Sequence, residues 1–157
     1  MNSRQRVLSA LNHQQPDRVP VDLSGHRSSG ISPIAYRRLR HYLGLPEVDV
    51  RVYDIVQQLA IVDDDVLDWA GGDTIELGRA FAQEARHWVE WTLPDGSPCL
   101  VPAWSIPERQ PGRWVIRSQE SGRVLAQMVD GSLYFEQTYW PFLEGRPKGV
   151  RVADVVS

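Results

Sequence analysis

Residues 3–22, SRQRVLSALNHQQPDRVPVD, set the first two elements of this chain. Ser3 can cap a helix, and the apolar residues after it recur at helical spacing, namely Val7, Leu8 and Leu11. Pro16 ends the helical stretch, because a proline disfavours helical geometry in the residue before it. Alternating apolar residues over 18–23 then predict a short strand. The chain is therefore expected to start with a helix followed by a strand.

Helices are expected to dominate the first half of the chain. Three further helices are predicted, over residues 33–43, 53–60 and 63–70. The first of these begins at Ser32, which a proline follows, and Gly44 ends it in a left-handed conformation. Three aspartates at 63–65 begin the last one, where the helix dipole favours negative charge. Residues 73–77 can add a second short strand, so residues 1–86 are predicted to be a helical lead-in with the first β and α elements.

From residue 87 the sequence alternates with period two, and turn residues recur at hairpin spacing. This pattern predicts a four- or five-strand antiparallel meander over residues 87–143. Its expected strands read WVEWTL, CLVPAW, RWVIRS, VLAQMV and LYFEQTYW, with a proline-rich loop over 105–112. Five of the six tryptophans lie here, Trp88, Trp91, Trp104, Trp114 and Trp140. Residues 144–157 are expected to be a loop and the start of a further element, so the chain is one partial domain.

Composition and length exclude several classes of protein. The chain has 157 residues and a net charge of −3, which disfavours nucleic-acid binding. No apolar run approaches the roughly 18 residues of a membrane span, and the first residues lack the pattern of a secretory signal. A single cysteine, Cys99, excludes an intrachain disulfide and indicates a cytoplasmic protein. A complete β/α barrel, typically roughly 250 residues long, does not fit this length.

One segment carries a candidate substrate-binding site. Asp22, His26 and Arg27 lie at the end of the predicted strand 18–23 and in the serine- and glycine-rich loop after it, where β/α enzymes place substrate contacts. His26 could transfer protons near neutral pH, and Arg27 could hold a carboxylate through two hydrogen bonds. The alternative, a polar surface loop, stays open, and no residue is assigned a catalytic role.

Other candidate groups have simpler structural explanations. The four histidines lie far apart and form no metal-ligand motif, so no metal site is predicted. Cys99 follows a proline after a turn and is expected to be a small packed residue. The aspartates at 63–65 cap their helix, and the tryptophans are expected to pack across strands, a ligand-stacking surface being the alternative.

Residues 3–13 (SRQRVLSALNH) and 16–22 (PDRVPVD) resemble the start of uroporphyrinogen decarboxylase-like proteins. The likeness is best in the branch that includes corrinoid- and coenzyme M-linked methyltransferases. It continues through AYRRL at 35–39, LGL at 43–45, VYDIVQQLA at 52–60, LDWAGGDT at 67–74 and EWTLPDG at 90–96. The resemblance thus covers nearly the whole chain, and it is specific to the superfamily rather than to one substrate.

The resemblance implies the N-terminal part of a TIM-like β/α barrel, an α/β fold that is α+β in isolation, with a β-meander insert. It implies a much longer complete enzyme, in which a His-x-Cys and a distant cysteine of the C-terminal half bind zinc. Zinc and corrinoid are therefore expected only in the complete system, and neither is bound by this chain alone. Where decarboxylases have an Arg-Gln-Ala-Gly-Arg type motif, residues 22–30 here read DLSGHRSSG, which leaves Arg27 as the nearby arginine.

The resulting expectation is an N-terminal portion or subunit of a uroporphyrinogen decarboxylase-like enzyme. It would act in corrinoid- and zinc-linked methyl transfer, would be inactive alone, and would contact substrate through Asp22, His26 and Arg27. Its partner is expected to be a second polypeptide carrying the rest of the barrel, or another copy of itself, because an incomplete barrel leaves edges uncovered. The alternatives are a non-catalytic protein-interaction module, a truncated fragment, or a uroporphyrinogen decarboxylase-type lyase.

Overall fold

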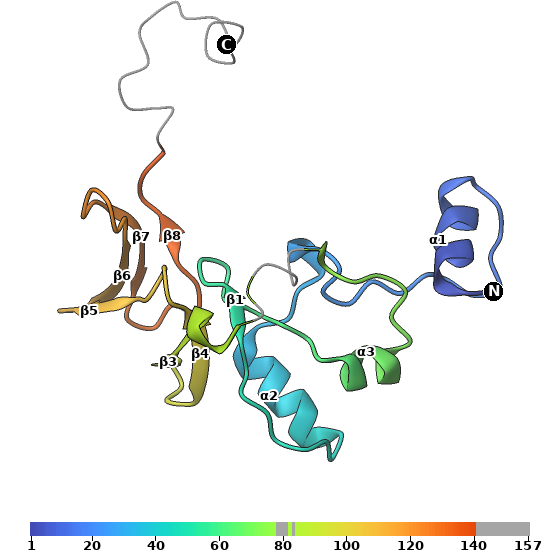
Figure 1. The fold of residues 1–157 in the computed structure, drawn as a ribbon, viewed down its shortest axis with the longest axis horizontal. Helices are drawn as coiled ribbons and strands as arrows, with labels where there is room; N and C mark the ends of the chain where they lie inside the picture. Colours follow the sequence, from blue (N-terminus) through green and yellow to red (C-terminus); the bar gives the residue numbers. More distant parts are fainter. Residues whose placement is uncertain (78–81, 83, 141–157) are drawn as a thin grey trace, which may run out of the picture.

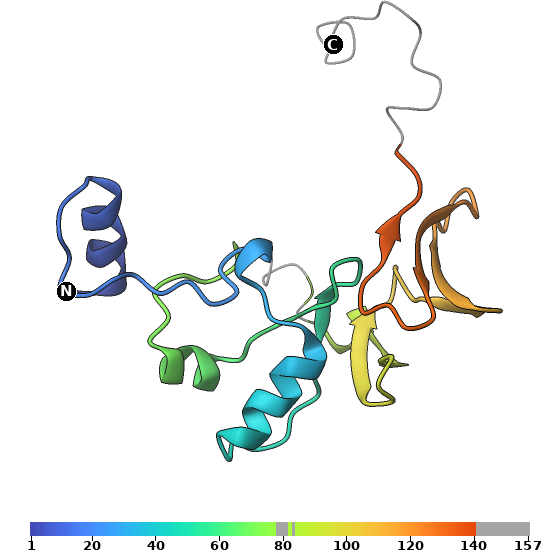
Figure 2. The same cartoon turned by 180° about the vertical axis from the view of Figure 1, so that it is seen from behind.

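The helices and the sheets lie toward opposite ends of an elongated molecule (Figures 1 and 2). The computed structural model describes residues 1–77, 82 and 84–140. The first helix lies at one end, a mixed central region follows, and a four-stranded sheet lies at the other end. The element predicted to begin within 144–157 lies outside the described residues.

Helix α1 spans Ser3–Leu11, as the sequence predicts, but its cap is one residue earlier than expected. The side-chain oxygen of Asn2 accepts a hydrogen bond from the Gln5 amide at 2.8 Å, and the Gln5 side chain accepts one from the Asn2 amide at 3.1 Å. This reciprocal pair satisfies two otherwise free N–H groups. Arg6 is the buried residue of α1, so charge rather than apolar packing attaches this helix.

Helices α2 (Pro33–Tyr42) and α3 (Asp64–Ala70) confirm two predictions, but the N-cap residue of α3, Asp63, makes no capping hydrogen bond through its side chain. The Ser32 hydroxyl accepts a hydrogen bond from the Ala35 amide at 3.2 Å, so the expected cap is present. Gly44 and Gly71 follow the two helices with φ of 67° and 65°, a conformation that glycine adopts without strain. A small hydrophobic core joins these helices through Tyr36, Val50, Ala60, Val62, Val66 and Leu67.

The helix predicted over 53–60 is wrong: this segment is a short antiparallel hairpin of β1 (Val52–Asp54) and β2 (Leu59–Ala60). Asp54 explains the difference, because its Oδ1 accepts hydrogen bonds from the amides of Val56 and Gln57, at 3.0 and 2.8 Å. These two hydrogen bonds close a turn, and Gln58 completes the turn with a positive φ of 55°. A side chain that binds the backbone locally thus replaces helical hydrogen bonds.

The strands predicted over 18–23 and 73–77 are also wrong, because neither segment forms a sheet. The two segments nevertheless meet, since the Asp73 amide donates to the Val21 carbonyl at 2.8 Å. The Val21 amide donates to the Asp73 side chain instead of to a second strand. Within the loop that follows, Arg27–Ser29 form the short 3-10 helix η1.

The antiparallel meander is confirmed, but it divides into two sheets. A turn with Gly96 at φ 85° joins β3 (Trp88–Thr92) to β4 (Pro98–Pro102), after the 3-10 turn η3 (Ala85–His87). The second sheet has the order β5 (Glu108–Gln110), β6 (Arg113–Arg117), β7 (Val124–Val129) and β8 (Glu136–Gln137). Strand β5 lies in the segment predicted to be a loop.

A second hydrophobic core holds the two sheets together. It combines Val52 and Ile55 of the first hairpin with Trp91, Leu93, Cys99, Val101, Ile116, Ala126, Met128 and Phe135. Trp91 and Trp114 pack edge to face across it, with ring centroids 5.4 Å apart. The molecule is therefore an α+β protein with open antiparallel sheets, not a closed barrel, over the described residues. Among the helices that the structure describes, none has the length and apolar content needed to cross a membrane.

Candidate functional site

The loop over residues 22–30 is built around Asp22. Its Oδ1 accepts hydrogen bonds from the Gly25 amide at 2.8 Å and from the Thr74 hydroxyl at 2.6 Å. The hydrogen bond from Thr74 is the main reason that the pKa of Asp22 lies below its usual value. A side chain at Gly25 would place its Cβ 2.3 Å from the Thr74 hydroxyl, so glycine is required for this close approach.

His26 turns the loop and keeps an accessible imidazole. The Ser28 amide donates to His26 Nδ1 at 3.2 Å, and the Ser28 hydroxyl lies 2.8 Å from the same nitrogen. An Nδ1 that accepts from a backbone amide carries no proton, so in the neutral ring the proton belongs on Nε2. The structure therefore holds His26 in one orientation and one tautomer.

Arg27 is anchored on one side and open on the other. Its Nε lies 3.0 Å from Asp54 Oδ2, and the Asp54 side chain is only 6% exposed whereas that of Arg27 is 61% exposed. The guanidinium is thus positioned by a buried carboxylate while part of it remains accessible to a ligand. The three predicted residues do lie in one loop, and Arg27 connects that loop to β1.

Two further residues of this region were not predicted from the sequence. The hydroxyl of Tyr53 and Oε2 of Glu76 are buried and have no hydrogen-bond partner within the described part of the chain. Burial, followed by the charges of Glu76 and Asp54, raises the pKa of Tyr53, and Arg27 opposes that rise. These electrostatic effects on Tyr53 mean that Glu76, Asp54 and Arg27 lie near its hydroxyl. Buried polar atoms without partners are uncommon and favour a ligand that supplies the missing hydrogen bonds.

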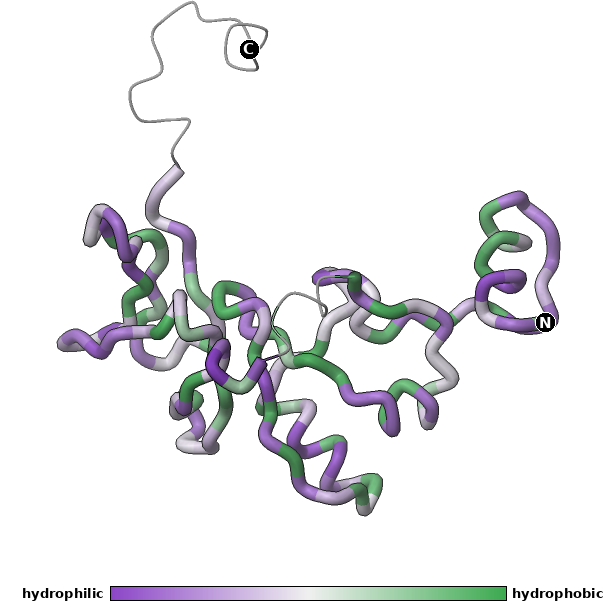
Figure 3. Tube along the Cα trace, in the orientation of Figure 1, coloured by the Kyte–Doolittle hydropathy of each residue, from purple (hydrophilic) through white to green (hydrophobic). Residues whose placement is uncertain are grey.

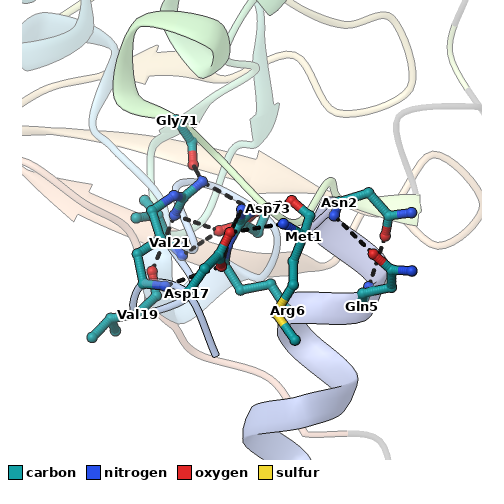
Figure 4. Close-up of polar contacts among 10 residues, drawn as sticks. Met1, Asn2, Gln5, Arg6, Asp17, Val19, Val21, Gly71 and Asp73 are labelled. Atoms are coloured by element: carbon teal, nitrogen blue, oxygen red, sulfur yellow. Dashed lines mark hydrogen bonds and ion pairs between the residues drawn. The ribbon is translucent and has the colours of Figure 1, made fainter. Parts of the chain in front are cut away.

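An ion-pair cluster around Asp73 positions the segment that leads into the loop (Figure 4). Asp73 has no exposed side-chain surface and pairs with both Arg6 and Arg18. The Val21 amide donates to its Oδ2 at 2.9 Å, and this hydrogen bond is the largest cause of a pKa well below the usual range. Arg6 also binds Asp17 Oδ1 through Nε at 2.7 Å. Residues 18–21 are therefore held beside Asp73, which brings Asp22 to Thr74.

The gathered groups are suited to binding and to proton transfer. Carboxylates (Asp22, Asp54 and Glu76), a guanidinium (Arg27), an imidazole (His26) and a phenol (Tyr53) come from three separate segments. Among the described residues, no three His, Cys, Asp or Glu side chains are grouped as metal ligands are. Cys99 lies elsewhere, between the sheets, and burial raises the pKa of its thiol to about 12. The predicted packed role of Cys99 fits this environment.

The sequence contained little signal for Tyr53 and Glu76. Tyr53 fell in the segment predicted to be a helix, and Glu76 in a predicted strand.

Comparison of the chain with protein-family models, with characterised proteins and with solved structures finds no match.

Proposed function

We propose that this chain is the N-terminal portion or a subunit of a uroporphyrinogen decarboxylase-like enzyme of the methyl-transfer branch. In this proposal it supplies one wall of the active site and is inactive until a second polypeptide completes a TIM-like β/α barrel. Loop 22–30, with Asp22, His26 and Arg27, contacts the substrate. Tyr53 and Glu76 join these residues as further contacts.

One observation supports the proposal most. Polar side chains from three segments gather at loop 22–30, which follows the opening stretch of the resemblance. Asp54 anchors Arg27 and Thr74 anchors Asp22. Two buried polar atoms near them, Tyr53 Oη and Glu76 Oε2, have no hydrogen-bond partner among the described residues. In β/α enzymes, the protein groups that contact the substrate come from several such segments at one end of the barrel.

Each residue has a distinct expected role. Arg27 binds an anionic or carbonyl oxygen of the substrate with its exposed N–H groups. His26 donates a hydrogen bond to the substrate through its accessible Nε2–H. Tyr53 and Glu76 accept or donate the hydrogen bonds that orient the substrate within the site.

The metal and the corrinoid are assigned to the completing polypeptide. When bound there, zinc lowers the pKa of a thiol acceptor so that the thiolate is available near neutral pH. The residues of this chain do not fit a zinc site, because its one cysteine is buried away from the loop and no group of three ligands occurs among the described residues. Its own contribution is to bind and orient substrate.

The test is affinity purification of the tagged chain from its own host, followed by mass spectrometry and an assay of the complex. We expect a stoichiometric partner that carries the missing barrel strands and a His-x-Cys motif, and methyl transfer only by the complex. Arg27→Ala should lower that activity at least about tenfold, because a charge-assisted hydrogen bond is lost. The free energy of unfolding should change by less than about 1 kcal/mol, because Arg27 is largely exposed.

Arg4→Ala, a loss of the same charge at an exposed position of α1, serves as the control and should leave activity unchanged. A complex in which Arg27→Ala is fully active would remove Arg27 from the site. A chain that purifies alone, without any polypeptide bearing the barrel strands, would contradict the split-enzyme proposal.

The alternative of a non-catalytic interaction module is favoured by one observation. Several large apolar side chains of the C-terminal region are exposed, including Trp104, Leu133, Tyr134 and Trp140. Exposed aromatic residues are typical of protein-docking surfaces. The same purification separates the two proposals, since a module would bind a partner that lacks barrel strands and zinc ligands.

A further inference from the structure

We propose that the groove between hairpin β3–β4 and residues 47–51 binds a molecule that carries both a carboxylate and a cationic group. The groove has a volume of about 980 Å³. Residues 47–51 lead from α2 to β1 and lie beside β4, where the Leu100 amide donates to the Val50 carbonyl at 2.9 Å (Figure 1). None of the lining residues belongs to loop 22–30, so this inference does not depend on the function proposed above.

Two buried N–H donors in the lining have no acceptor among the residues that the structure describes. Trp91 is 8% exposed, and its indole N–H makes no hydrogen bond. The Nε–H of Arg37 is likewise buried without a partner. Leaving such donors unpaired is costly, because each has lost its hydrogen bonds to water. A ligand with acceptor atoms in the groove would restore them.

Both donors belong to residues that adjoin the segment Pro98–Cys99. Trp91 is the cross-strand partner of Cys99, and Arg37 donates through Nη2 to the carbonyl of Pro98, the residue before Cys99. That hydrogen bond holds the guanidinium against β4. A carboxylate has two oxygens for two such donors, and its charge compensates that of Arg37. The inner part of the groove is therefore suited to a carboxylate.

The outer part of the groove has the opposite character. Four carboxylates line the groove, those of Glu47, Asp49, Asp63 and Glu90, against two guanidinium groups, Arg37 and Arg51. Asp63 pairs with Arg40, whereas Glu47, Asp49 and Glu90 are exposed and have no ion pair within the described part of the chain. Such a surplus of negative charge repels a simple anion. The ligand must therefore also present a cation to this rim.

Amino acids and short basic peptides with a free C-terminus share this chemistry. Capture of a C-terminal carboxylate by N–H donors is an established mode of peptide recognition. The volume falls within the range of sites for drug-sized molecules, roughly 300–1,000 Å³, which a short peptide also fills. Both sources can be tested with defined probes.

The test is calorimetric titration of the full chain with Ala-Ala-Lys, its C-terminal amide, Ala-Ala-Glu and free lysine. We expect one Ala-Ala-Lys per chain, and binding at least about tenfold weaker for the amide and for Ala-Ala-Glu. Equal affinity for free lysine would assign the groove to amino acids, and stronger binding of the tripeptide would assign it to peptide ends. Absence of binding by both lysine probes, or equal affinity for acid and amide, would overturn the proposal.

Two substitutions locate the binding. Trp91→Phe removes the indole N–H and keeps an aromatic ring, and Arg37→Gln removes the charge; each should weaken binding about tenfold. Arg38→Gln is the matched control, since Arg38 is exposed on the same helix and lies outside the groove. Unchanged affinity in folded Trp91→Phe and Arg37→Gln would refute this site. If either variant fails to fold, as circular dichroism would show, the comparison of acid with amide on the unaltered chain still tests the proposal.

Discussion

Asp73 shows how a single buried carboxylate joins segments that are distant in the sequence. It receives hydrogen bonds from Arg18, which is 55 residues away, and from Arg6 and the Val21 amide. Removing Asp73 would leave the largely buried Arg6 with Asp17 as its remaining carboxylate partner, and Arg18 without its ion pair. The residue is therefore important for stability rather than for chemistry.

Asp73→Asn should lower the melting temperature by about 5 °C or more, because Arg6 loses one of its two carboxylate partners and Arg18 loses its ion pair. Thermal unfolding followed by circular dichroism at neutral pH measures this change. Asp68→Asn, at an exposed position of α3, should have little effect and serves as the control. Equal losses in the two variants would show that the cluster has no special role.

The same carboxylate predicts a dependence of stability on pH. The pKa of Asp73 lies well below its usual value of 3.8 in the folded chain. A lowered folded-state pKa stabilises the fold fully above the unfolded-state pKa, and that contribution is lost as the pH falls toward the folded-state value. The difference in melting temperature between wild type and Asp73→Asn should thus be constant above about pH 5 and shrink below pH 4. A constant difference down to pH 2 would contradict this assignment.

At the scale of elements, the hairpin β1–β2 depends on side-chain hydrogen bonds within its turn. Asp54 Oδ1 accepts from two amides of the turn, while Oδ2 pairs with Arg27. One carboxylate therefore shapes the turn and positions a residue of the candidate site. Substitutions of Asp54 can distinguish the roles of its two oxygens.

Asp54→Ala should reduce the free energy of unfolding by about 2 kcal/mol, because two turn amides lose their acceptor. Asp54→Asn can keep an acceptor oxygen for the turn and loses only the charge facing the largely exposed Arg27, so the expected loss is below about 1 kcal/mol. Urea-induced unfolding of both variants measures the difference. Equal losses would show that the ion pair, rather than the turn, holds the hairpin.

At the scale of the whole molecule, apolar residues are distributed along its length (Figure 3), and several of them are exposed. Neither hydrophobic core includes a residue of α1, and Leu11 and Trp69 are 70% and 60% exposed. The N-terminal helix is held by the Arg6 ion pairs instead. Surface of this kind favours association with a partner or with another copy.

The isolated chain should therefore self-associate as its concentration rises, which sedimentation velocity would detect. The double substitution Leu11→Ser with Trp69→Ser should shift the equilibrium toward monomer. Gln14→Ser changes an exposed polar residue just after α1 and serves as the control. A chain that stays monomeric over the whole concentration range would show that these side chains drive no association.

Several elements could be predicted because their determinants are neighbours in the sequence. Ser32 and the proline after it begin α2, Gly71 ends α3, and the turn at Gly96 joins β3 to β4. Caps and tight turns are formed by residues within a few positions of one another. Loop 22–30 was identified for the same reason, since its polar residues follow one another directly.

The sequence by itself determined the cap of α2, the hairpins of the C-terminal half and the grouping of Asp22, His26 and Arg27 in one loop. Only the tertiary structure decided that residues 53–60 form a hairpin and that Tyr53 and Glu76 adjoin the loop. It also decided that residues 18–21 lie beside Asp73. The hairpin results from a local competition, in which the Asp54 side chain takes backbone amides that a helix would use. The other contacts join residues far apart in the chain through burial and ion pairing, which outweigh local strand preference.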